Sequence, residues 1–159
     1  MTDATLPVLS YLQKLLAGEL TAQDHITQLY PTAISQTLKF NILQVAAGEA
    51  SLMLHTDPKL HGNQQGTVHG GLLAELADAA IGTAHSTLMQ PNETFTSIDL
   101  RIQFFRPVWQ DKLTAVAKPV QSGKTVTHYE CMIYKDDGKV AAKASGIVMT
   151  LRGAQAKGR

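Results

Sequence analysis

The sequence predicts an α+β fold in which one curved antiparallel β-sheet wraps around one long central α-helix. The first observation is an apolar segment rich in alanine and glycine, from Gly70 to Met89, which Pro91 ends. The second is that most of the remaining chain alternates apolar and polar residues with the period of a β-strand. Because small side chains let strands approach closely on several sides, a wrapped sheet is the economical way to bury this helix.

A helical extension is predicted at the N-terminus, over residues 1–36. Apolar residues recur with helical spacing from Val8 to Leu16, and Gly18 follows as the expected stop. A second short helix is expected to run from a cap at Thr21 toward Tyr30, because the following proline would end it. These two helices would cover part of the main domain.

The strands are expected before and after the long helix. Alternation occupies residues 38–42, 50–55, 97–104, 113–120, 125–134 and 140–151. The first two segments predict a hairpin around Gly48, and the last four predict an antiparallel meander whose clearest turn is Asp136–Lys139. Residues 57–67 are polar and predict a loop. One domain is therefore expected at residues 37–152, with a disordered tail at residues 153–159.

The composition bounds the possible partners and location. Of the 159 residues, 44% are hydrophobic and 17% charged, and the net charge of +1 includes no basic block, which argues against nucleic acid as a partner. The most apolar segment carries Glu75, Asp78 and His85, so no membrane span is expected. A single cysteine, Cys131, fits a reducing compartment, and we expect a cytoplasmic protein.

The entrance to the long helix is the first candidate site. Gly70 and Gly71 stand where the loop meets the helix, and the first amides of a helix lack internal partners. Glycine lets a ligand carbonyl approach these amides closely, and the helix dipole adds positive potential. The segment could therefore polarise a carbonyl or hold an oxyanion. An ordinary glycine-rich turn is the alternative.

Two carboxylates on the helix are the second candidate. Asp78 and Glu75 lie one turn apart in an otherwise apolar helix, where a buried acid must be paired or functional. The residues alone leave the choice between these acids open. Asp78 follows Gly70 by eight residues, which is about 12 Å along a helix. If both residues act on one carbonyl, they must come from two chains related by a two-fold axis.

Other reactive patterns are weaker. The six histidines include no pair with the spacing of a zinc site. The run Gly123–Thr125 lacks the earlier glycine of a phosphate-binding loop, because that position is Lys118. No metal and no cofactor are therefore expected.

These motifs together resemble the hotdog-fold thioesterases, in particular the phenylacetate-degradation (PaaI-like) branch. The resemblance covers about Leu38 to Leu151. It rests on the run from Asn63 through Gly66-Thr67-Val68-His69-Gly70-Gly71, on Asp78 at the family's offset, and on Ser97–Leu100 leading to Phe105 and Pro107.

The resemblance implies a role for each matching residue. Gly70 would offer its N–H to the thioester carbonyl, Asp78 of the partner subunit would act as general base or nucleophile, and Asn63 would orient water or substrate. It also implies an acyl-CoA substrate, assembly as a homodimer or homotetramer, and no metal or prosthetic group. The residues expected to contact the substrate are His69, Gly71 and Ser97.

Two other functions stay open. A hotdog protein that binds acyl-CoA without hydrolysing it, or that has a regulatory role, would share this fold. A hotdog hydratase would need an Asp and His acid–base pair in a motif that the sequence does not contain. The identity of the acyl group, and the contacts of the CoA phosphates beyond a suggested role for Arg106, Lys124 or Arg152, are not determined by the sequence.

Overall fold

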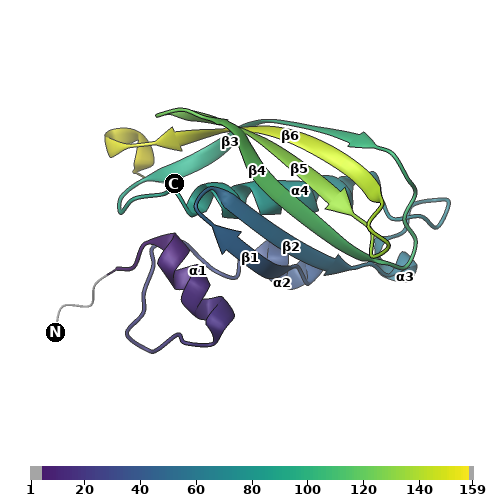
Figure 1. Ribbon diagram of the computed structural model, residues 1–159, viewed down its shortest axis with the longest axis horizontal. Helices are drawn as coiled ribbons and strands as arrows, with labels where there is room; N and C mark the ends of the chain where they lie inside the picture. Colours follow the sequence, from purple (N-terminus) through teal and green to yellow (C-terminus); the bar gives the residue numbers. More distant parts are fainter. Residues whose placement is uncertain (1–4, 158–159) are drawn as a thin grey trace.

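The computed structural model describes residues 5–157 and confirms the predicted α+β hotdog architecture (Figure 1). The helices are α1 (Val8–Ala17), α2 (Ala33–Leu38), α3 (Pro58–His61), α4 (Gly70–Ser86) and the 3-10 helix η1 (Gly153–Ala156). The strands are β1 (Asn41–Ala46), β2 (Glu49–His55), β3 (Thr94–Phe104), β4 (Lys112–Ser122), β5 (Val126–Tyr134) and β6 (Val140–Leu151).

The six strands form one antiparallel sheet in the order β1-β2-β4-β5-β6-β3. The predicted meander is correct for β4, β5 and β6 but wrong for β3, which pairs with β6. Both sides of β4 are occupied by β2 and β5, so β3 must cross to the far side of the sheet. As a result β1 and β3 are the two edge strands.

The long helix α4 lies against the curved face of the sheet and contacts β2 through β6 (Figure 1). Its buried side includes Ala77, Ala80 and Ala84, which have no exposed surface. These small side chains let the strands approach the helix from several directions, as the composition predicts. At the β1 edge of the sheet, α1 packs beside β1, and its residue Leu12 is fully buried (Figure 1).

Helix α4 ends three residues before the predicted end at Met89. The hydroxyl of Ser86 donates to the Thr83 carbonyl, and the hydroxyl of Thr87 donates to the Ala84 carbonyl. Hydroxyl groups that bond back to the preceding turn compete with the helical hydrogen bonds, so the helix stops here. The C-terminal half of α4 is anchored by His85, whose ring contacts the hydroxyl groups of two residues on β5 and β6 at 3.0 and 2.9 Å, Tyr129 and Thr150.

The predicted helix from Thr21 to Tyr30 is absent. The carboxylate of Asp24 accepts hydrogen bonds from the Thr21 N–H and hydroxyl and pairs with Lys14, which holds this segment in a turn. The second helix begins after Pro31 instead, where the Thr32 side chain caps α2 by accepting from the Ser35 N–H. The predicted first strand, residues 38–42, therefore begins late, at Asn41.

The loop and the tail both contain short helices. Residues 57–67, predicted to be a loop, include α3, which Asp57 caps. Residues 153–156 of the predicted disordered tail form η1, while residues 158–159 lie outside the described residues. The domain boundaries at residues 36 and 152 stay a prediction.

Two further expectations concern location. None of the helices described between residues 5 and 157 has the length and apolar character needed to cross a membrane. Cys131 is a buried free cysteine on β5, and burial raises the pKa of its thiol to about 12, as befits a packing residue. The cytoplasmic location stays a prediction.

Candidate active site

The N-terminus of α4 leaves one backbone donor free. The His69 Nδ1 accepts a hydrogen bond from the Gly71 N–H at 3.1 Å and so caps the helix. The preceding backbone is held by bonds from the Val68 N–H to Val108 and from the His69 N–H to His61. Among the described residues, the Gly70 N–H donates to no group. This amide is therefore available to a ligand, whereas His69 and Gly71 shape the helix entrance.

Asn63 organises the loop that leads into the helix. Its Oδ1 accepts from the backbone N–H groups of Gln65 and Thr67, at 2.9 and 3.2 Å. Its Nδ2 donates to the Thr67 hydroxyl at 2.8 Å. The amide oxygen is thus occupied, and one N–H of Nδ2 is left for a water or substrate. A role for Asn63 in orienting a ligand and a role in shaping the loop are both compatible with these contacts.

A hollow of about 410 Å³ opens at Gly70. Asn63, Phe104 and Arg106 are among the residues that line it. A Cβ atom on Gly70 would come within 2.8 Å of the Phe104 ring, so only glycine fits beneath this ring in its present position. The hollow combines a free backbone donor, an apolar wall and one cation.

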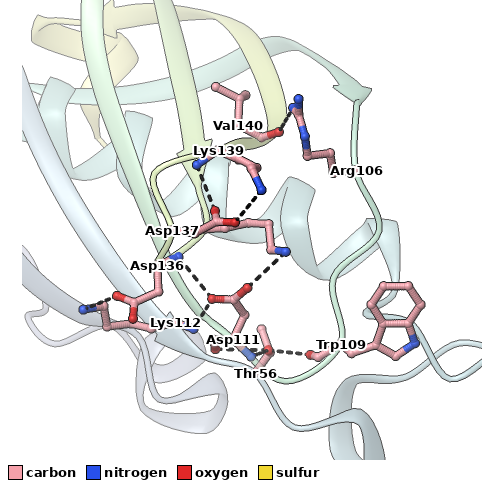
Figure 2. A network of polar contacts seen from close by, with 10 residues as sticks. Thr56, Arg106, Trp109, Asp111, Lys112, Asp136, Asp137, Lys139 and Val140 are labelled. Atoms are coloured by element: carbon pink, nitrogen blue, oxygen red, sulfur yellow. Dashed lines mark hydrogen bonds and ion pairs between the residues drawn. The ribbon is translucent and has the colours of Figure 1, made fainter.

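Arg106 is the only one of the three suggested CoA contacts at this hollow. Its Nη1 donates to the Val140 carbonyl at 2.7 Å, beside the polar network around Asp111 (Figure 2). The Asp111 carboxylate accepts from the Lys112 and Asp136 N–H groups and so fixes this end of the sheet.

Arg152 and Lys124 lie at the other end of β3 and β6. Arg152 donates to the Glu93 carboxylate and to the Lys124 carbonyl. The register pairs Thr94 with Leu151 and Phe104 with Ala142, so the two ends of this ladder are about 33 Å apart. The three suggested contacts therefore do not gather on one chain.

A second hollow of about 410 Å³ surrounds Asp78. The Ser97 hydroxyl donates to Asp78 Oδ1 at 3.2 Å, which joins α4 to β3. The register of β3 against β6 shifts between Ser97 and Asp99, so Ile98 is the extra residue of a β-bulge. Bulges re-aim side chains, and this one lies where Ser97 turns toward the acid.

Glu75 shares the hollow with Asp78. The pKa of Glu75 is raised, first because burial disfavours its charged form and second because the charge of Asp78 lies nearby. Asp78 accepts a hydrogen bond from Ser97, whereas the Glu75 carboxylate makes no hydrogen bond within the described part of the chain. The choice of Asp78 over Glu75 as the functional carboxylate stays a prediction.

One chain does not bring Gly70 and Asp78 together. The two residues line different hollows and are separated by about 12 Å along α4. On β3, Phe104 flanks the first hollow and Ser97 flanks the second, about 23 Å away along the strand. Asn63 joins Gly70, and Ser97 joins Asp78. In residues 5–157, no cluster of His, Cys, Asp or Glu has the arrangement of a metal site.

The sequence pattern does not indicate three residues that line these hollows. Thr67 and Phe104 line the Gly70 hollow, and Asp99 lines the Asp78 hollow. Phe104 reads as an ordinary residue of an alternating strand, and only the fold places its ring on Gly70. Thr67 stands four residues after Asn63, a spacing typical of a side chain that closes its own loop, so local sequence could have indicated it. Asp99 reaches its hollow through the bulge, which the alternation pattern does not reveal.

We expect Gly70→Val to lower kcat/KM for a substrate at least about tenfold, because the side chain obstructs the free N–H. The valine also displaces the Phe104 ring, so the double variant with Phe104→Ala is the matched control. Steady-state kinetics and gel filtration of both variants measure the effect. Recovery of activity in the double variant would show that ring displacement, and not access to the amide, caused the loss.

One family model matches this chain, and curated relatives are similar to it. A family model described as "Thioesterase superfamily" matches residues 65–142, which include both hollows in large part. A protein of Deinococcus radiodurans named "Putative esterase" is 30% identical over 123 residues, and the match covers 75% of this chain and 81% of that relative. The medium/long-chain acyl-CoA thioesterase YigI of Salmonella typhimurium is 25% identical, with coverage of 76% and 87%.

Other relatives are matched over part of their length. A relative from Saccharolobus solfataricus is 32% identical, but the match covers 55% of this chain and 61% of the relative. Among solved structures, the TT0310 protein of Thermus thermophilus has a TM-score of 0.69 at 28% identity, covering 74% of this chain and 97% of that one. The PaaI protein of Escherichia coli has a TM-score of 0.74 at 23% identity, covering 94% and 98%, which shows the fold.

Proposed function

The chain belongs to the thioesterase superfamily, and we propose that it hydrolyses an acyl-CoA thioester to a free acid and CoA. The observation that carries this proposal is that α4 presents a free N–H at its start and, two turns later, a carboxylate beside a separate open hollow. The Gly70 N–H can stabilise the charge that develops on a thioester oxygen, and Asp78 can supply the base. Each group has an open hollow beside it.

The site is proposed to form between two subunits. The edge strand β3 exposes Ile98 and Phe104, and Phe105 follows directly after its end; each of the three is about half exposed. An uncovered apolar edge favours pairing with another strand. Antiparallel pairing of two β3 strands would place the Phe104 end of one chain beside the Ser97 end of the other. Gly70 of one subunit would then face Asp78 of its partner. The two-fold axis of a homodimer would repeat this contact and so form two such sites. Pairing of two dimers into a homotetramer is part of the same proposal.

The chemistry follows from these positions. The thioester oxygen accepts a hydrogen bond from the Gly70 N–H, where the helix dipole favours the negative charge of the tetrahedral intermediate. Asp78 either removes a proton from an attacking water or attacks the carbonyl carbon itself. In the general-base route, breaking the C–S bond leaves the free acid, and the CoA thiolate takes up the proton that Asp78 removed from water. In the direct route, breaking the C–S bond releases the CoA thiolate and leaves an acyl–aspartate anhydride, which water then cleaves to the free acid and the Asp78 carboxylate.

A thiol-release assay tests the proposal. Purified protein is mixed with a panel of acyl-CoAs with aromatic, hydroxylated and straight chains from four to sixteen carbons, because one relative is named for medium and long chains. We expect release of free CoA from at least one member of the panel. Binding of acyl-CoA without any CoA release would support a non-catalytic role instead, and addition of water to an enoyl-CoA would support a hydratase.

A further inference from the structure

The edge strand β3 carries a short pattern of charges in its middle. Of its eleven residues, Thr94–Phe104, only Asp99 and Arg101 are charged. Residues two apart in a strand share a face, and the Arg101 Nε lies 3.1 Å from the Asp99 carboxylate. The Arg101 side chain is 79% exposed, so its guanidinium can meet a further group. The edge strand therefore presents one negative and one positive charge side by side on one face.

Leu100 separates the two charges and lies on the other face of β3. It packs against the core together with Ile102, two residues further on. The register of β3 against β6 shifts only before Asp99, so the strand is regular from there to its end. Residues 99–101 are thus a regular piece of strand, with an apolar side chain on one face and an ion pair on the other.

Two copies of β3 that pair antiparallel across a two-fold axis must place one residue opposite itself. Residues directly opposite each other in such a pair share a face of the sheet, and their backbone groups both point toward the partner or both point away. The axis therefore passes through a residue and not between two residues. Moving the axis from one residue to the next slides the strands past each other by two residues, about 7 Å.

The between-subunit site restricts the choice of axis. Phe104 flanks the Gly70 hollow and Ser97 flanks the Asp78 hollow, so the two hollows meet when the axis lies near the middle of this stretch. The middle falls between Leu100 and Arg101. The geometry of the site alone leaves both residues as candidates for the axis.

The charges of β3 decide between these candidates. With the axis at Arg101, the two guanidinium groups meet, and with the axis at Asp99, the two carboxylates meet. Like charges directly opposite each other destabilise strand pairing. With the axis at Leu100, each Asp99 lies opposite Arg101 of the partner subunit, and Leu100 packs on its own copy. The nearby Glu130 and Lys143 form an ion pair with each other, so they do not alter this balance.

We propose, on the basis of the between-subunit site above, that Asp99 and Arg101 set the register of the β3 pair, with the two-fold axis at Leu100. In this register Phe104 lies within two residues of Ser97 of the partner subunit. A slip of the axis by one residue would move each Gly70 hollow about 7 Å relative to the Asp78 hollow that it meets, which exceeds the length of a hydrogen bond. Asp99 and Arg101 are thus positioning residues, which act on catalysis through the alignment of two subunits.

Cysteine substitutions locate the axis. A residue on the axis lies about 4.5 to 5.5 Å from its own copy, within the range of Cα separations, about 4.4 to 6.8 Å, that a disulfide spans. The residues on either side lie about 7 to 8 Å or more from their copies. We expect Leu100→Cys to form at least about fivefold more linked dimer under mild oxidation than the matched controls Asp99→Cys and Arg101→Cys. The native Cys131 is buried and common to all three variants.

Charge reversals test whether these residues meet across the axis. Arg101→Asp leaves β3 with two negative charges and Asp99→Arg leaves it with two positive charges, so each variant should pair poorly with itself. In a mixed dimer every positive residue lies opposite a negative one, although both chains have lost their internal ion pair. After refolding together, mixed dimers should make up at least about four-fifths of all dimers in native mass spectrometry, against about half for random pairing. The neutral pair Arg101→Gln and Asp99→Asn is the matched control and should give about half.

Activity gives a readout that a purely structural role would not change. CoA release by the mixed dimers should exceed that of either charge variant alone at least about fivefold, because restored register aligns Gly70 with Asp78 of the partner. Linkage that is absent from Leu100→Cys, or no stronger there than in its neighbours, would overturn the register, and random pairing of the charge variants would overturn the role of the charges. Both of these results concern assembly. Failure of the unmodified protein to hydrolyse any acyl-CoA would instead overturn the proposed function.

Discussion

Replacing Asp78 with asparagine is expected to lower kcat at least about 100-fold, the usual scale for loss of a general base or nucleophile. Asparagine has the shape of aspartate and can still accept a hydrogen bond from Ser97, so the contact between α4 and β3 should survive. What disappears is the negative oxygen that we propose takes a proton from water or attacks the carbonyl. The thiol-release assay under saturating acyl-CoA measures kcat directly.

Glu75→Gln is the matched control. Glu75 lies one turn earlier on α4 and lines the same hollow, but Ser97 contacts Asp78. We expect less than about a tenfold loss of kcat in Glu75→Gln, with both variants eluting like the unmodified protein in gel filtration. If Glu75→Gln proved the more damaging of the two in a well-folded protein, the catalytic carboxylate would be Glu75.

Much of the fold follows from sequence periodicity, because the periodic segments carry their own signals. The segment from Gly70 onward has apolar residues on every side, as expected of a helix surrounded by strands. The Asp136–Lys139 turn and the strands beside it are local features, and they were predicted correctly. The position of β3 depends on which strand edges are already paired, and no pattern within β3 contains that information.

The errors near the N-terminus have a local physical cause. Thr21 and Asp24 read as a helix start, but Asp24 also reaches Lys14 on α1, and this ion pair holds a turn. Propensity is a weak prior that one such contact can override. The sequence predicts that Pro31 ends a helix, whereas in the structure Pro31 directly precedes Thr32, the cap of α2.

The candidate site was only partly visible in the sequence. The free amide at Gly70 follows from its place at the start of a helix, and the separation from Asp78 follows from counting residues. The Ser97 contact depends on a bulge in β3, and the hollow beyond the C-terminal end of α4 depends on residues 27–33 lying beside that end. Both arise from contacts between distant segments, so the pattern of any one segment could not reveal them.

The shared site predicts that two inactive variants restore each other. Gly70→Val and Asp78→Asn each damage every site of their own dimers. In a mixed dimer, one site combines the intact Gly70 of one subunit with the intact Asp78 of the other, and the second site carries both changes. Random pairing makes about half of the dimers mixed, each with one of two sites intact. Activity should therefore approach roughly one quarter of the unmodified value if the sites are independent.

The most direct measurement is the activity of the two variants after they are unfolded together and refolded, with subunit exchange confirmed by mass spectrometry. Each variant refolded alone gives the baseline. Recovery to roughly one quarter of unmodified activity is the result expected when Gly70 and Asp78 serve one carbonyl from different chains. Activity that stays at the level of the separate variants, despite confirmed exchange, would contradict a site formed by Gly70 of one subunit and Asp78 of the other.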